Sequence, residues 1–223
     1  FAVGDIHGET QHLFKLMSCF PQLDTEDTIV FVGDYVDRGP RSKQVVDYVR
    51  ALAAQVPARV VALRGNHEDA WLRVIDNGGW HGFTGPPTNG CLAALRSYMG
   101  GPQPRDDEFP LPHEAEALHN GSFFDPEHVA WFRTLPLWYE DAHAIYVHAG
   151  LVKEDGVFAH PSETQSKAAL LWHRNHDFFR NYRGKRVVFG HTTTEYLPEE
   201  LSSYTPEDPT DMCAGPCTIG LDT

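Results

Sequence analysis

Short runs of apolar, mostly β-branched residues alternate along this chain with stretches in which apolar residues recur at helical spacing. Three such units follow one another in the first third of the sequence. The expected strands are residues 1–3, 28–32 and 60–63, and the expected helices are residues 12–20, 42–55 and 67–75. This alternation predicts an α/β fold, in which a sheet is covered by helices.

The alternation of expected strands and helices stops between residues 76 and 127. Glycine, proline and aromatic residues are frequent there, and only residues 91–99 favour a helix. We interpret this region as a cap inserted into a single domain that spans residues 1–223. A helix is expected over residues 126–134, with Asp125 as its N-cap and proline at its first position. Further strands are expected at residues 144–147 and 186–189.

Polar motifs follow the expected strands, usually after a glycine that lets the backbone turn sharply. The motifs are Gly4-Asp5-Ile6-His7-Gly8, Gly33-Asp34-Tyr35-Val36-Asp37-Arg38-Gly39, Gly65-Asn66-His67-Glu68, Val147-His148-Ala149-Gly150 and Gly190-His191-Thr192. Any one of them alone is more typical of a turn, a helix cap or a structural histidine. Their shared context favours one site at the sheet edge, and carboxylate, imidazole and amide groups without cysteine suit manganese, iron or zinc.

These blocks, in this order, resemble the calcineurin-like metallophosphoesterases. Within them they are most similar to the phosphoprotein phosphatase branch and its compact bacterial and phage-like serine/threonine phosphatases. The resemblance extends from Phe1 to about His191, with Thr193 standing where bacterial relatives commonly have proline. It implies a four-layer α/β/β/α sandwich of two mixed sheets flanked by helices, with an inserted cap.

The resemblance also implies two divalent metal ions, with manganese expected and iron, zinc or magnesium as alternatives. The implied ligands are Asp5 and His7 for the first ion, Asn66, His148 and His191 for the second, and Asp34 as a bridge between them. In the family pattern, a hydroxide shared by the two ions attacks the phosphate ester directly. No phosphorylated enzyme intermediate is then required.

The remaining family roles concern the leaving group and the phosphate. His67 resembles the general acid and Asp37 the carboxylate that orients it, although a histidine here could also cap the following helix. Arg38 is expected to bind the phosphate, together with Asn66 and His67, because a guanidinium offers paired donors. Arg174 is the candidate second phosphate ligand, with an ordinary surface residue as the alternative.

The net charge and the cysteines indicate which partners and which cellular location to expect. A formal net charge of −13 opposes binding to nucleic acid or to an anionic membrane, so neither partner is expected. No apolar run reaches the roughly 20 residues that span a bilayer, and no signal peptide is evident. Cys213 and Cys217 are expected as unpaired thiols, and four scattered cysteines favour a reducing, cytoplasmic location. The oligomeric state is left open.

Three functions remain in competition. The first is a protein serine/threonine phosphatase acting on a phosphorylated protein or peptide. The second is a nucleotide hydrolase of the symmetrical diadenosine tetraphosphatase type, for which Trp80, Phe83 and Tyr98 could stack on a base. The cap holds only Arg96 and Arg105 as cations, which favours protein substrates over a dinucleotide or another phosphorylated small molecule. The third, an inactive scaffold, conflicts with the complete set of expected ligands.

Overall fold

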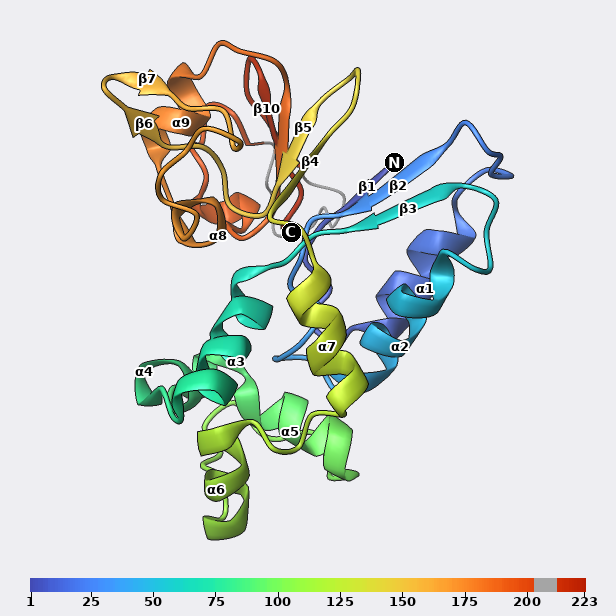
Figure 1. Ribbon diagram of the computed structural model, residues 1–223, viewed down its shortest axis with the longest axis vertical. Coiled ribbons are helices and arrows are strands. Elements are labelled where there is room, and N and C mark those ends of the chain that lie inside the picture. Colours follow the sequence, from blue (N-terminus) through green and yellow to red (C-terminus); the bar gives the residue numbers. More distant parts are fainter. Residues whose placement is uncertain (203–211) are drawn as a thin grey trace.

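The computed structural model describes residues 1–202 and 212–223, and its two larger β-sheets lie in the upper half of Figure 1. The first sheet contains β1 (Ala2–Val3), β2 (Thr28–Phe31) and β3 (Arg59–Ala62), in that order and all parallel. Helices α1 (Thr10–Ser18) and α2 (Ser42–Leu52) connect these strands. Because such crossover connections make consecutive strands parallel, the expectation of two mixed sheets is wrong for this sheet.

The second sheet is mixed, as expected. Its order is β4 (Trp138–Glu140), β5 (Ile145–Val147), β8 (Val187–Phe189), β10 (Thr218–Gly220) and β9 (Cys213–Ala214). The central strands β5, β8 and β10 are parallel, whereas β4 and β9 run antiparallel at the two edges. A separate hairpin is formed by β6 (Lys153–Glu154) and β7 (Val157–Phe158).

The alternation of side chains along β2 shows how the layers are arranged. Phe31 packs in one buried cluster with Val45 and Val49 of α2, whereas Val30 packs in another with Val188 of the second sheet. Successive residues of a strand point to opposite faces, so the first sheet has helices on one face and the second sheet on the other. The two faces of β2 therefore belong to different layers of the fold.

The second sheet is buried in the same way. Val147 and Val187 share a cluster with Phe178 and Phe179 of α9 (His176–Asn181), and α8 (Ala169–Trp172) contributes Leu170. Helices therefore cover the outer face of this sheet (Figure 1). The four-layer α/β/β/α arrangement is confirmed.

Residues 78–125 lie between α3 (Asn66–Asn77) and α7 (Pro126–Thr134). They contain α4 (His81–Thr84), the 3-10 helix η1 (Pro87–Asn89), α5 (Cys91–Met99) and α6 (Pro112–Asn120). The expected helix over residues 91–99 has the same bounds as α5, but α4 and α6 were not predicted. Both are short, and α6 has only two buried residues, so neither carries a clear apolar period.

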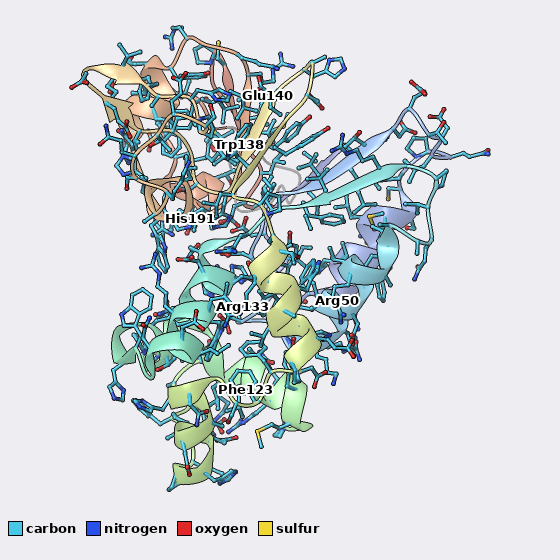
Figure 2. All side chains as sticks on the ribbon, in the orientation of Figure 1. Arg50, Phe123, Arg133, Trp138, Glu140 and His191 are labelled. Carbon is cyan, nitrogen blue, oxygen red and sulfur yellow. The ribbon has the colours of Figure 1, made fainter. Side chains whose placement is uncertain are left out.

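Helix α7 begins where the sequence predicts, but Asp125 has a different role. Its side chain makes no capping hydrogen bond and instead accepts one from Lys43 of α2 at 2.6 Å. At the other end of α7, Arg133 forms an ion pair with Asp76 of α3 at 2.5 Å (Figure 2). The two pairs tie α7 to the helices on either side of it.

Two other expectations concern the chain as a whole. Among the described residues, no helix is both long enough and apolar enough to cross a membrane. Cys213 and Cys217 are free thiols, as are Cys19 and Cys91.

One further 3-10 turn, η2 (Thr194–Tyr196), follows β8.

Candidate metal centre

The carboxyl ends of strands from both sheets converge on one region of the molecule. His191 lies where the second sheet meets the helical region, and its Nδ1 is 2.8 Å from Asn66 Oδ1 at the start of α3 (Figure 2). His148 Nε2 is 2.8 Å from the same oxygen. Residues 82 and 125 positions apart in the chain therefore meet in one cluster.

Asp34 occupies the centre of the cluster. Its Oδ2 lies 3.4 Å from His7 Nε2, 3.6 Å from His148 Nε2 and 3.9 Å from His67 Nε2. Burial alone raises the pKa of Asp34, but the imidazoles of His148, His67 and His7 outweigh it and hold the pKa well below its usual value. A carboxylate that faces histidines from both sides has the position expected of a bridging ligand.

The tautomer of His7 follows from its surroundings. Its Nδ1 lies 2.7 Å from the Val36 carbonyl oxygen, which can only accept, so Nδ1 carries the proton. Burial lowers the pKa of His7 to about 3, so the ring is neutral and Nε2 keeps its lone pair. That nitrogen is buried without a protein hydrogen-bond partner and faces Asp34.

The second group has the same character. His148 donates from Nδ1 to the Val32 carbonyl oxygen at 2.9 Å, and burial lowers its pKa. Its unprotonated Nε2 then faces the side-chain amide of Asn66, 2.8 Å from Oδ1, and His191 Nδ1 lies 2.8 Å from the same atom. The donor set of neutral imidazoles, an amide oxygen and a carboxylate thus fits a divalent metal.

Asp5 contacts the cluster through the backbone of a predicted ligand. Both of its carboxylate oxygens accept from the backbone N–H of His191, at 3.1 and 3.2 Å. Among the described residues, two groups could each hold a metal ion, and within each group the ligand atoms lie within 4.8 Å of one another. One group is His7, Asp34 and His67, and the other is Asp34, His148 and His191. The structure therefore brings five of the six predicted ligands, and also His67, to the centre, with Asp5 bonded to its edge.

A cavity of about 510 Å³ reaches the Asp5 and His7 side of the cluster. Leu13 and Leu16 of α1 and Leu221 near the C-terminus form part of its wall. The first predicted metal position is thus accessible from solvent, although most of the ligands are buried.

The backbone at the site is unusually strained. Positive φ angles occur at six non-glycine residues of the described chain, and five of them are predicted site residues. These five are His7, Asp34, Asp37, Arg38 and His191. Each such conformation costs on the order of 1–3 kcal/mol and persists only where its surroundings impose it. Strain of this kind is common in functional sites.

Glu68, which the sequence did not single out, holds part of this strained backbone in place. It is fully buried, and its Oε2 accepts from the N–H groups of Asp34 and Gly65, both at 3.0 Å. Its Oε1 accepts from Tyr35 at 2.8 Å and from Val36 at 3.4 Å. The available signal was a glutamate three residues after the helix N-cap, the spacing of a capping box.

His67 and Asp37 form a buried pair beside Asp34. His67 Nδ1 lies 2.6 Å from Asp37 Oδ2, and the indole N–H of Trp71 donates to both oxygens of Asp37 at 3.0 Å. Burial lowers the pKa of His67, but the charges of Asp34 and Asp37 raise it above its usual value overall. A cationic His67 with Nε2 facing the site has the geometry required of a proton donor, and Trp71 is a further partner that the sequence did not reveal.

The two predicted phosphate-binding arginines lie at the surface next to the cluster. The backbone N–H of Arg38 donates to Gly90 in the cap at 3.1 Å, and its carbonyl oxygen accepts from Gln103 at 2.7 Å. Arg174 donates from Nη2 to the His191 carbonyl oxygen at 3.0 Å. Arg174 thus contacts the loop that carries a predicted ligand, whereas Arg38 is anchored through its backbone.

Known proteins show two kinds of similarity. In sequence, the chain is 38% identical over 75 residues to the serine/threonine-protein phosphatase SIT4 of Candida albicans, a match that covers 32% of this chain and 24% of that relative. The matching region is thus about a quarter of the relative's length.

In structure, the chain resembles a Saccharomyces cerevisiae serine/threonine phosphatase with similarity to human PP5, with 18% identity and a TM-score of 0.56. That match covers 100% of this chain and 66% of the other. A cold-active protein-tyrosine phosphatase from a psychrophilic Shewanella matches with 17% identity and a TM-score of 0.55, over 99% of this chain and 70% of the other. These similarities establish the fold.

The family model described as calcineurin-like phosphoesterase matches residues 1–195, which include all six predicted metal ligands. Fold, motif order and ligand geometry agree with that match. The chain therefore belongs to the calcineurin-like phosphoesterases, a family of metal-dependent hydrolases.

Proposed function

We propose that this chain is a phosphomonoesterase that removes phosphate from phosphoserine and phosphothreonine in proteins, with two divalent metal ions. The observation that carries the proposal is the buried Asp34 carboxylate, which faces unprotonated imidazole nitrogens of His7 and His148 from two directions. Asp5 and His7 would hold one ion, and Asn66, His148 and His191 the other. We propose manganese as the metal.

The two ions, when bound, would lower the pKa of a water molecule and offset the charge that develops on the phosphoryl group. The rest of the chemistry belongs to the chain itself. His67 would donate a proton to the departing oxygen from Nε2, while Asp37 holds the opposite side of the ring. Arg38 and Arg174 would bind the phosphoryl oxygens with their guanidinium groups.

Charge in the cap supports a protein substrate over a dinucleotide. Arg96, one of its two arginines, is 6% exposed and is bound by Glu114 at 2.8 Å and Glu108 at 2.6 Å. Its charge is therefore neutralised inside the cap. Only Arg105 remains exposed there, which is too little cationic surface for a chain of several phosphates.

The aromatic residues of the cap support the same conclusion. Phe83 is 3% exposed and packs against His67 and Trp71, while Tyr98 is hydrogen-bonded to His128 at 2.7 Å. Of the three aromatic residues considered for base stacking, only Trp80 is exposed, at 36%. The local similarity to SIT4 and the Gly33–Gly39 motif also favour phosphorylated proteins.

The test is a substrate panel at saturating manganese. It compares kcat/KM for a phosphoserine peptide, a phosphothreonine peptide, a phosphotyrosine peptide of the same sequence and diadenosine tetraphosphate. We expect the first two to be the best substrates, and Asp34→Asn to be inactive towards all four. A large rate advantage for the dinucleotide would instead support the diadenosine tetraphosphatase alternative. Repeating the best reaction with iron, zinc and magnesium tests the proposed metal.

A further inference from the structure

Asp222 follows β10 at the same sheet edge as the predicted ligands. Strands β8 and β10 are parallel, with Gly220 paired to Phe189, so continuing this register by two residues brings Asp222 level with His191. Its local sequence, an apolar strand followed by Gly220, Leu221 and an acidic residue, also resembles the other ligand motifs. Asp222 lies outside the five motifs that predicted the site residues.

The backbone around Asp222 is held firmly on two sides. Leu221 donates from its N–H to the Phe189 carbonyl oxygen at 2.9 Å, and the Asp222 carbonyl oxygen accepts from Thr194 at 2.8 Å. Gly4, which follows β1, also lies close to this segment. A Cβ added to Gly4 would be only 2.4 Å from the Leu221 carbonyl oxygen. Asp222 is thus fixed between the segments that carry Asp5 and His191.

The Asp222 side chain lacks the partner that such a position requires. It is 6% exposed, and its Oδ2 is buried without a hydrogen bond from any residue that the structure describes. A buried carboxylate oxygen without a partner is costly, and nearly all buried polar groups are satisfied in folded proteins. This oxygen therefore indicates a ligand beyond the described residues of the chain.

The charges around Asp222 are those of the site. Burial raises the pKa of Asp222, Asp34 raises it further, and the guanidinium groups of Arg38 and Arg174 oppose them. Asp222 and Asp34 therefore lie close enough to repel each other in the region where two cations are proposed. Without cations, this arrangement is repulsive.

We propose that Asp222 is a third carboxylate of the metal centre, which contributes its unpartnered oxygen and its charge on the side of the ion held by Asp5 and His7. This inference rests on the proposed metal-dependent function. Two dications bring four positive charges, and the predicted ligand set offers only Asp5 and Asp34 against them. Asp222 brings the number of carboxylates to three, so it strengthens cation binding.

The test measures manganese binding directly, by isothermal titration of the metal-free protein. Asp222→Asn keeps the size of the side chain and removes its charge. We expect the weaker of the two manganese sites to lose roughly 10- to 100-fold in affinity, the range seen when partners around a metal site are removed. Asp107→Asn, on an exposed cap loop, removes the same unit of charge from a residue outside the cluster and is expected to bind manganese like the wild type.

A second readout separates this role from a structural one. Removing the repulsion between Asp222 and Asp34 should raise the Tm of the metal-free protein while reducing the increase in Tm that manganese produces. Unchanged affinity in Asp222→Asn, or an equal loss in Asp107→Asn, refutes the inference. Asp222→Ala provides the same comparison if the asparagine variant does not fold. A wild-type protein that binds two ions but releases no phosphate would refute the phosphatase function and leave the role of Asp222 standing.

Discussion

Replacing Glu68 with glutamine tests how the strained backbone around Asp34 is maintained. Each carboxylate oxygen of Glu68 accepts from two backbone N–H groups, Asp34 and Gly65 on one side and Tyr35 and Val36 on the other. A glutamine can place its carbonyl oxygen on only one side. Whichever way the amide turns, its NH₂ group faces two buried donors.

The expected cost follows from that count. A buried donor left without an acceptor costs about 1–3 kcal/mol, so two of them predict a loss of about 2–6 kcal/mol in the free energy of unfolding. Total stabilities of native proteins are only about 5–15 kcal/mol. Glu68→Gln should therefore be folded at low temperature but much less stable, and the loop that carries Asp34 should be less well ordered.

Urea unfolding of the metal-free protein measures this loss. Glu116→Gln, on the exposed surface of α6, makes the same chemical change without buried partners and should shift the free energy of unfolding by less than about 0.5 kcal/mol. Manganese affinity should fall in Glu68→Gln alone, because the ligand Asp34 loses its support. A loss of stability no larger than that of Glu116→Gln would refute the assigned role of this carboxylate.

Three further predictions concern catalysis and pH. Asp34→Asn should lower kcat on a phosphopeptide by more than about 100-fold, which exceeds the usual effect of removing a residue that hydrogen-bonds to a metal ligand. A smaller loss in steady-state assays would count against a bridging role. His67→Asn should retain manganese but slow alkyl phosphates by roughly 10²- to 10⁴-fold and aryl phosphates far less, so equal slowing would exclude His67 as the acid. Burial lowers the pKa of His128 below its usual 6.5, so the unfolded state binds more protons and stability should fall as pH drops below about 6.5. Urea titrations across that range should show a shallower pH dependence for His128→Gln, and an unchanged slope would contradict the assignment.

Local sequence determined the elements and the chemistry of the motifs. Periodic apolar positions located α2 to within a few residues, because this helix buries one face, whereas proline after a polar N-cap residue located the start of α7. The glycine-flanked motifs identified the groups that could bind metal. Helices α4 and α6 escaped prediction, since α4 has only four residues, and α6 has few buried side chains and an apolar residue, Leu111, at its N-cap.

Tertiary structure alone decided how those groups meet. The proton on His148 is assigned by a carbonyl oxygen 116 residues away, and its free nitrogen faces an amide oxygen 82 residues away. Glu68 and Asp222 matter because buried N–H groups or buried charges from distant segments surround them. These contacts depend on distances between distant segments and on burial, and the local sequence encodes neither. The sequence therefore predicted which groups could bind metal, whereas only the fold showed how they cluster around Asp34 and which carboxylates support them.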